Sequence, residues 1–542
     1  MRDGSASRRF PSPAERHPSS LPGPSYNARR MSVRLLRPLL VVLALSATFT
    51  AIRGRELFVG DETKYGQVVR EMRATGQVFL PTLQGTPFTH KPPVHFWLID
   101  ALTQVFGLYS IWSFVLPSLA AYAFLLWVMA RHAGMLAAFV CGSFAMIWAS
   151  AQTARMDVSF TALIALAAFL LERFFDRDDF RALLLAALSI AIATLIKGPM
   201  APVIALTLFL FESLRRKRAP RGNYLPALAA LIVLPLLWVV PAMLRGGSAY
   251  TREIVVKQTV GRAVGSWVHR SPPWYYLTHA PADLFPWFFL AVIGGIVVWR
   301  AGNPRGCFAL MWLGAVLLPY SILSSKLDVY MMALLPPAAV VVAEYLRDPQ
   351  PRFGRLAHRL NLAMLALQAL IGLAGLTIGA RFVKGPDAAL LTLPSVRGVF
   401  VTLLLAAIAA LFVVLVIART LVASSVAVGL VPLAMFAYLG LVLTPLANEL
   451  ASTRPLVAAL ERQHVPGGDI AVYWIPFLWT HDLPRDLEQV HYVDPAQLQA
   501  MPPPAVIATS RAHANEIAAS LRGYHKVDEL RMIGKWFDVY RR

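Results

Sequence analysis

The chain has little charge and little cysteine, and each shortage excludes a class of protein. Only 15% of its 542 residues are charged, whereas a soluble globular chain carries about 25%, so a soluble enzyme is excluded. The two cysteines, Cys141 and Cys307, fall in apolar runs and predict small buried side chains rather than a disulfide or a metal pair. The sequence also lacks a glycine-rich phosphate loop, so no nucleotide site is predicted.

Hydrophobic sequence dominates instead, at 57% of all residues. Apolar runs recur from Leu35 to Leu443, each near the roughly 20 residues that a bilayer core requires. The pattern predicts a polytopic α-helical membrane protein with about thirteen transmembrane helices. The expected spans are 35–52, 111–130, 134–151, 158–174, 181–196, 199–214, 224–244, 282–300, 305–322, 327–346, 357–380, 396–418 and 421–443.

The two ends of the chain differ from this hydrophobic middle. Residues 1–34 are predicted to be a disordered basic segment, with the true start at Met1 or Met31. The first apolar run resembles a signal peptide but has a poor cleavage site, so it is expected to remain as a span of the membrane domain, 35–450. Residues 451–542 alternate strand-like and helical pieces, such as DIAVYWI and RPLVAALERQ, and predict a small α/β module.

The net charge of +21 lies mainly in short loops between spans. That placement follows the positive-inside rule, so no nucleic-acid partner is predicted. The doubtful segment is 94–108, which is short and carries His95. If it is an interfacial helix rather than a span, the basic loops share one side. The loops 53–110 and 245–281 and the C-terminal module then gather on the opposite face, which is periplasmic for a bacterial inner-membrane protein.

The most polar stretch directly follows the first span. From Asp61, DETKYGQVVREMRA has helical periodicity, with Tyr65, Val68, Val69 and Met72 on one face. This pattern suits a helix lying at the membrane interface. Asp61 is then either the N-cap of that helix or a carboxylate that acts as base, orients a nucleophile or holds a metal.

Several motifs in order carry a resemblance to a known family. DExxYxxxxREM occupies 61–72, KPP 91–93, IKGP 196–199, SPPWYYLTHAPADLFPW 271–287 and SSKLDVYMMALLPP 324–337. Together they resemble the bacterial aminoarabinose transferases of lipid A and the wider protein-mannosyltransferase-related membrane glycosyltransferases with the GT-C fold. The resemblance implies transfer of a sugar from a polyprenyl (undecaprenyl) phosphate donor to a periplasmic-side acceptor. Transfer of 4-amino-4-deoxy-L-arabinose to lipid A is one such case.

The resemblance also implies roles for individual residues. Asp61 matches the family's first-loop aspartate, and Glu62 and Asp157 are further catalytic candidates. A hydroxyl acceptor would need Asp61 as general base, whereas a phosphate acceptor would be positioned by it. Asp157 either shares this work or pairs with Arg155. The residues expected to bind the donor phosphate, unless they only snorkel or form an aromatic belt, are Lys64, Tyr65, Lys91, Lys197, Lys326 and Tyr330.

One departure from the family concerns a metal. Members closest to the lipid A enzymes carry glutamate before the KP lysine, whereas this chain carries His90. His90 and His269 are candidate zinc ligands, although two ligands are fewer than the usual count. A third would come from Asp61, the substrate or water, and the alternative is that both histidines are polar surface.

Two classes of function remain. The first is the glycosyltransferase, whose acceptor is lipid A, another envelope glycan or lipid, or a protein hydroxyl. The alternative is a transporter or flippase of a lipid-linked substrate, which would show internal repeats and polar residues at mid-membrane. The sequence has no clear repeat, and its acids stand at span edges, which favours chemistry at the membrane surface.

Overall fold

The computed structural model describes residues 46, 54–218, 220, 222–254, 270–382, 390–417, 419–463, 467–481 and 483–542. The predicted segment 1–34, nearly all of the predicted span 35–52, and His269 lie outside these residues.

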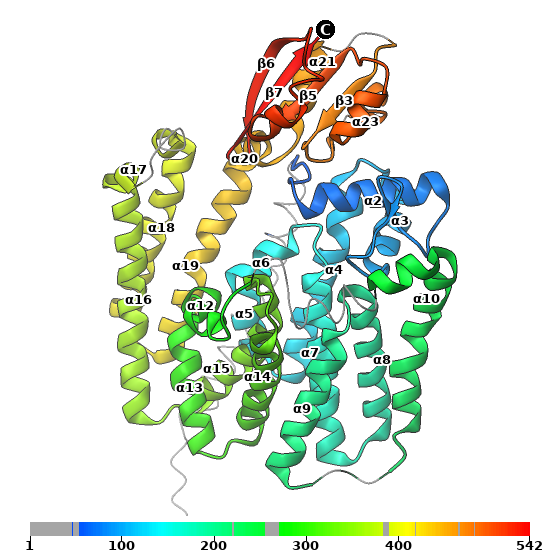
Figure 1. Cartoon of the computed structure of the whole chain (residues 1–542). Helices are drawn as coiled ribbons and strands as arrows, with labels where there is room; N and C mark the ends of the chain where they lie inside the picture. Colours follow the sequence, from blue (N-terminus) through cyan, green and yellow to red (C-terminus); the bar gives the residue numbers. More distant parts are fainter. Residues whose placement is uncertain are drawn as a thin grey trace, which may run out of the picture.

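Figure 1 shows a helical bundle with a small sheet module above one end. The helices of the membrane part and first loop are α2 (Asp61–Thr75), α3 (Val94–Phe106), α4 (Ile111–His132), α5 (Met135–Gly142), α6 (Ala145–Ala151), α7 (Asp157–Arg177), α8 (Phe180–Lys197), α9 (Met200–Arg216), α10 (Leu225–Arg252), α12 (Tyr275–Asp283), α13 (Phe288–Arg300), α14 (Pro304–Ile322), η2 (Asp328–Leu334), α15 (Leu335–Arg347), α16 (Pro351–Thr377), α17 (Gly379–Phe382), α18 (Pro394–Phe412), η4 (Val413–Ile417), α19 (Leu421–Val442) and α20 (Thr444–Ala451).

The predicted fold class, a polytopic helical membrane protein, is confirmed. Within the described residues nine helices are long and apolar enough to cross a membrane, and α12 with α13, bent by 110°, make a tenth if counted as one span. The expected single span 134–151 is instead two short helices, α5 and α6. They part at Gly142 and Ser143, both weak helix formers, and the Ser143 hydroxyl accepts a hydrogen bond from the Trp287 indole at 2.9 Å. The segment 94–108 forms α3, which at 13 residues is too short to span.

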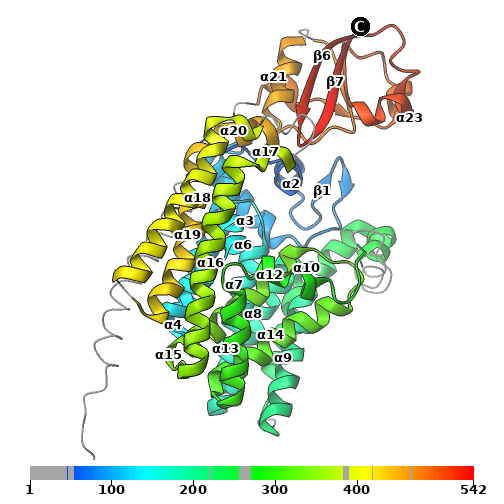
Figure 2. The same ribbon diagram turned by 90° about the vertical axis from the view of Figure 1, so that its left-hand side faces the viewer.

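Burial separates an inner from an outer layer of helices. The apolar stretch of α7 is 83% buried, and so is that of η2 with α15, whereas the corresponding stretch of α18 is 17% buried. Figure 2 shows α16, α18 and α19 side by side along one flank. Helices that are apolar all round yet exposed in the protein need lipid around them. The outer layer is therefore the lipid-facing surface.

Basic side chains collect at one end of the bundle. Arg216, at the end of α9, pairs with Asp176 of α7 at 2.7 Å. Arg305, at the start of α14, lies 3.5 Å from Glu172 of α7. Arg347, at the end of α15, lines a pocket together with Arg216 and Arg305. The positive-inside pattern of the sequence predicted that these loop ends share one side of the membrane. The acidic side chains that the arginines contact neutralise part of their positive charge.

The C-terminal module is a five-stranded mixed sheet. Its strands are β3 (Ile470–Tyr473), β4 (His491–Tyr492), β5 (Val506–Ser510), β6 (His525–Met532) and β7 (Lys535–Arg541), in the order β4-β3-β5-β7-β6. β3 pairs in parallel with β4 and β5, and β7 pairs antiparallel with β5 and β6. The sheet is accompanied by α21 (Arg454–Gln463), α22 (Arg485–Glu488), α23 (Pro495–Ala500) and η5 (Arg511–Ile517).

The module is docked onto the first loop through Trp479. This side chain is 1% exposed, and a Cβ at Gly66 of α2 would meet its ring at 2.8 Å. Only glycine in the middle of α2 allows that close approach. The Val59 amide also donates to the Ala451 carbonyl at 2.7 Å. The chain that follows the last span therefore packs directly against the helix that begins at Asp61.

Candidate active site

Helix α2 carries Asp61 at its first position, and the side chain does not cap the helix. Gly60 occupies the N-cap position, so no side chain caps the helix there. The predicted alternative, in which Asp61 is the N-cap, is therefore wrong. Its carboxylate, about one-third exposed, instead accepts a hydrogen bond from Arg155 at 3.1 Å. The helix face predicted to be apolar is buried, which leaves Asp61 at the rim of the packed first loop.

A line of alternating charges runs from Asp61 into the bundle. The Arg155 guanidinium contacts Asp61 at 3.1 Å and lies 4.0 Å from the Asp157 carboxylate. Asp157 accepts a hydrogen bond from the Lys197 ammonium at 2.5 Å, and both of these side chains are more than nine-tenths buried. The main partner of Asp157 is thus Lys197 rather than Arg155. Asp157 and Lys197 were both candidates from the sequence, but positions 40 residues apart along the chain do not indicate that they pair.

Lys197 also lines a pocket of about 510 Å³ that we call the lysine pocket. Its polar residues include His90, Lys91 and Tyr330, and the Lys197 ammonium lies 4.9 Å from the centre of the Tyr330 ring. Most of the remaining wall is apolar, and several of these side chains are exposed on the outside of the bundle: Val203, Leu318 and Ile322. The lysine pocket therefore combines cationic side chains with a largely apolar lining.

Glu62 has a different environment from Asp61. Both of its carboxylate oxygens accept hydrogen bonds from the Arg55 guanidinium at 2.8 Å, and one also accepts from the Phe58 amide at 2.8 Å. The Ala154 amide donates to the other at 2.5 Å. This buried carboxylate ties the first loop to the turn that carries Arg155, so we assign it a positioning role.

Replacing Glu62 with glutamine is expected to destabilise the fold. The buried Arg55 guanidinium would lose its counter-charge, and removing one member of a buried ion pair costs about 3–5 kcal/mol. The measurement is the thermal unfolding temperature of the purified protein in detergent. An unchanged unfolding temperature would show that the pair contributes nothing to the fold.

Three predicted phosphate ligands lie outside the lysine pocket. Lys326 is buried, and its ammonium donates to the carbonyls of Ser271, at 3.1 Å, and Leu323. Burial lowers the pKa of this ammonium. Lys64 lies on α2, 3.9 Å from Asp61. Tyr65 is buried, and burial, with the nearby Asp61 carboxylate, raises the pKa of its phenol well above the usual value, so it remains neutral.

His95, which the sequence indicated only as a polar residue of the doubtful segment 94–108, also belongs to this region. It is completely buried in α3, and its ring packs edge-on against Tyr65 at 5.9 Å. Burial lowers the pKa of His95 from 6.5 to about 4, although the Asp157 charge acts in the opposite direction. The imidazole is therefore neutral at physiological pH, and no motif in the sequence indicates this position.

The burial of His95 predicts a pH-dependent stability. Between pH 6.5 and about 4 the unfolded chain takes up a proton at His95 and the folded chain does not. The contribution is complete above pH 6.5 and is lost as the pH falls toward 4, by about 3 kcal/mol in total. Unfolding temperatures measured across this range should fall less steeply in His95→Phe. Parallel curves for the two proteins would contradict the prediction.

Of the two predicted zinc ligands, His90 alone lies among the residues that the structure describes. His90 lines the lysine pocket, whereas His269 lies outside the described residues. Within the part of the chain that the structure describes, no group of three or more His, Cys, Asp or Glu side chains is placed to hold a metal ion. The described donors alone do not form a zinc site, and zinc stays a prediction that depends on His269.

The arrangement defines a class, a multi-pass membrane protein with a GT-C fold and a charged cluster at one end of its bundle. The fold is similar to that of ArnT from Cupriavidus metallidurans bound to undecaprenyl phosphate. The TM-score is 0.75 at 18% identity, over 92% of this chain and 97% of that one. The apo form of the same protein gives 0.71. At this identity the likeness establishes the fold.

Sequence comparison adds relatives. Residues 90–238 match the family model described as dolichyl-phosphate-mannose-protein mannosyltransferase. The chain is 26% identical over 351 residues to the undecaprenyl phosphate-alpha-4-amino-4-deoxy-L-arabinose arabinosyl transferase of Yersinia enterocolitica, covering 61% of this chain and 63% of that protein. The Pectobacterium atrosepticum protein of the same name is 25% identical, over 64% and 66%. The chain thus spans slightly less than two thirds of these two relatives. The resemblance predicted from the motifs is confirmed.

Proposed function

We propose that this chain is a membrane glycosyltransferase that takes a sugar from a polyprenyl-phosphate donor. The lysine pocket is the observation that carries the proposal. Its cationic side chains, Lys91 and Lys197, suit a phosphate, and its apolar lining suits the polyprenyl chain. A transporter would need polar groups along a path through the bundle, whereas the charges of the candidate active site lie at the end of the bundle next to the first loop.

The residues divide the work of transfer. An acceptor oxygen forms a bond to the anomeric carbon, the bond between that carbon and the phosphate oxygen breaks, and the lipid phosphate leaves with the electron pair. Lys91 and Lys197 stabilise its charge, while buried Asp157 holds the Lys197 ammonium in place. Asp61, the more exposed acid, faces the acceptor. It takes the proton from an acceptor hydroxyl, or positions an acceptor phosphate and stabilises positive charge on the sugar.

Within this class we propose 4-amino-4-deoxy-L-arabinose as the sugar, undecaprenyl phosphate as the carrier and lipid A as the acceptor. The names of the Yersinia and Pectobacterium relatives and the ligand of the Cupriavidus ArnT structure support this choice. We further propose that Asp61 and the lysine pocket face the periplasm across the bacterial inner membrane. The basic end formed by α7, α9, α14 and α15 supports this orientation.

The test is transfer by the purified protein in liposomes. Undecaprenyl-phosphate-linked aminoarabinose and lipid A are supplied, and mass spectrometry measures the lipid A. We expect one added sugar mass with the protein and none without it. Loss of the donor without a lipid A product would redirect the search to a glycan or protein acceptor, and an intact donor with every acceptor would refute the proposal. Repeating the assay with a chelator and added zinc tests the metal.

A further inference from the structure

A second pocket lies where the C-terminal module meets the first loop. Its volume is about 620 Å³, within the range of about 300–1,000 Å³ that is usual for small-molecule sites. We call it the seam pocket, and it shares no lining residue with the lysine pocket. Three parts of the chain form it: 54–57 before α2, 109–112 at the start of α4, and the module through α21 and 479–481.

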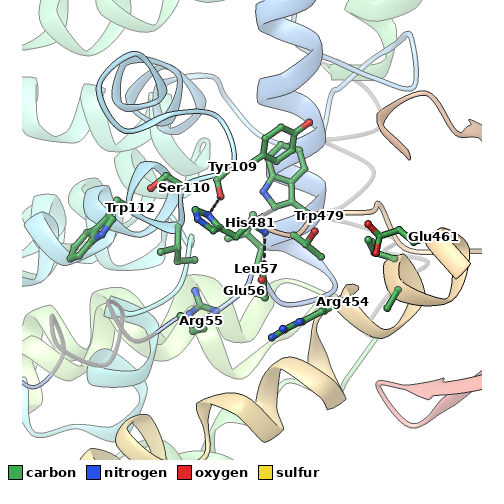
Figure 3. Close-up of a pocket in the computed structure, with 15 residues that line it drawn as sticks. Arg55, Glu56, Leu57, Tyr109, Ser110, Trp112, Arg454, Glu461, Trp479 and His481 are labelled. Atoms are coloured by element: carbon green, nitrogen blue, oxygen red, sulfur yellow. Dashed lines mark hydrogen bonds between the residues drawn. The ribbon is translucent and has the colours of Figure 1, made fainter. Parts of the chain in front are cut away.

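One face of α21 forms a wall of the seam pocket. Arg454, Val457, Ala458 and Glu461 line it, at the i, i+3, i+4 and i+7 spacing that places residues on one helical face. Arg454 makes no ion pair with any other described residue. In Figure 3 its side chain extends toward the Arg55 side of the pocket, while Glu461 lies at the other edge. Two guanidinium groups therefore share this pocket.

Buried donors without partners accompany these cations. Arg55 Nε and Trp479 Nε1 are buried nitrogen atoms with no hydrogen-bond partner among the described residues. Tyr109 and Trp112 add aromatic surface, and in Figure 3 His481 lies between Trp112 and Trp479. Planar charged groups suit phosphate and hydroxyl oxygens, and aromatic rings suit the apolar face of a sugar. This combination fits a phosphorylated saccharide better than a purely apolar ligand.

The seam pocket is connected to the candidate active site. Arg55 lines it and also holds Glu62, the neighbour of Asp61 in α2. Trp479 lines it and packs against Gly66 of the same helix. An occupant of the pocket would therefore be held beside the helix that carries Asp61.

We propose that the seam pocket binds the phosphorylated saccharide of the acceptor, separately from the donor in the lysine pocket. This inference rests on the proposed glycosyltransferase function. It assigns the C-terminal module a part in acceptor binding, with Arg454 as its phosphate ligand and α21 as the element that presents it.

Arg454→Gln tests the proposal, with Arg462→Gln as the matched control. Arg462 lies on the same helix, pairs with Asp528 at 2.7 Å and does not line the pocket. We expect Arg454→Gln to raise the KM for lipid A about tenfold or more, with kcat and the KM for the donor unchanged. The control should keep wild-type values. An unchanged KM for the acceptor would overturn the proposal. A fall in kcat alone would also overturn it, because that result would mean that Arg454 only stabilises the position of α2.

A binding measurement keeps the two proposals separable. Trp112 and Trp479 line the pocket, so tryptophan fluorescence should change when glucosamine 1-phosphate is added to the wild-type protein, and this change should be lost in Arg454→Gln. The measurement does not depend on transfer, so it tests the pocket even if the proposed activity is absent. An equal response to inorganic phosphate alone, or an undiminished response in Arg454→Gln, would overturn the assignment.

Discussion

Asp61→Asn is expected to lower the rate of sugar transfer by about 10²–10⁴-fold, the usual contribution of a general acid–base group. The substitution keeps the shape of the side chain and its ability to accept from Arg155, but it removes the charge. The fold should persist, because Gly60 rather than Asp61 occupies the N-cap of α2. Transfer is measured in liposomes by product mass, and the unfolding temperature in detergent reports on the fold.

Asp100→Asn is the matched control for Asp61→Asn. Asp100 belongs to the same loop and lies 3.8 Å from Arg73 near the far end of α2. It has the same charge as Asp61, but its ion pair is with Arg73 and involves neither Lys197 nor Arg155. Transfer should be nearly unchanged in this variant. Equal losses in both variants would mean that Asp61 acts only through the structure of the loop.

Lys197→Gln has the second large expected effect. Removing one group that stabilises developing charge costs about 10²–10³-fold in rate. The substitution also leaves the buried Asp157 carboxylate without its partner, and an unpaired buried charge costs about 3–5 kcal/mol of stability. The single variant should therefore lose both transfer and thermal stability, and the two losses must be separated.

The double variant Asp157→Asn/Lys197→Gln separates them. It removes both charges, so stability should return toward the wild-type value while transfer stays low. Lys217→Gln, at the exposed end of α9, is a control for the loss of one lysine charge and should change neither quantity. If the double variant regains transfer, Lys197 is needed for folding rather than for binding the donor phosphate.

Local patterns predicted much of the fold. The apolar face of DETKYGQVVREMRA is the buried face of α2, and RPLVAALERQ is α21 from its first residue to its last. Both follow from helical periodicity, which is a property of neighbouring residues. The strand-like piece DIAVYWI contains β3, and two similar pieces, AVIAT at 505–509 and WFDVY at 536–540, cover most of β5 and β7. β6, HKVDELRM, was not predicted, because only its last residue, Met532, is buried and its position depends on pairing with β7.

Contacts between segments that are distant along the chain could not be predicted from the sequence. Lys91, Lys197 and Lys326 had the same prediction, because the order of the spans places all three at the same edge of the membrane. Only the folded chain separates the first two, which line the lysine pocket, from Lys326, whose ammonium is held by carbonyl groups. Likewise, Trp479 had no distinguishing neighbours in the sequence, yet it packs on α2 more than four hundred residues earlier.

The sequence by itself determined the membrane class, the collection of polar groups in the loops and the family resemblance, because hydropathy, charge and motif order are readable along the chain. The tertiary structure decided which charges pair: Asp61 with Arg155, Asp157 with Lys197, and Glu62 with Arg55. Pairing and burial depend on distances across the bundle. These distances separate the exposed acid proposed for catalysis from the buried acids that hold other groups in place.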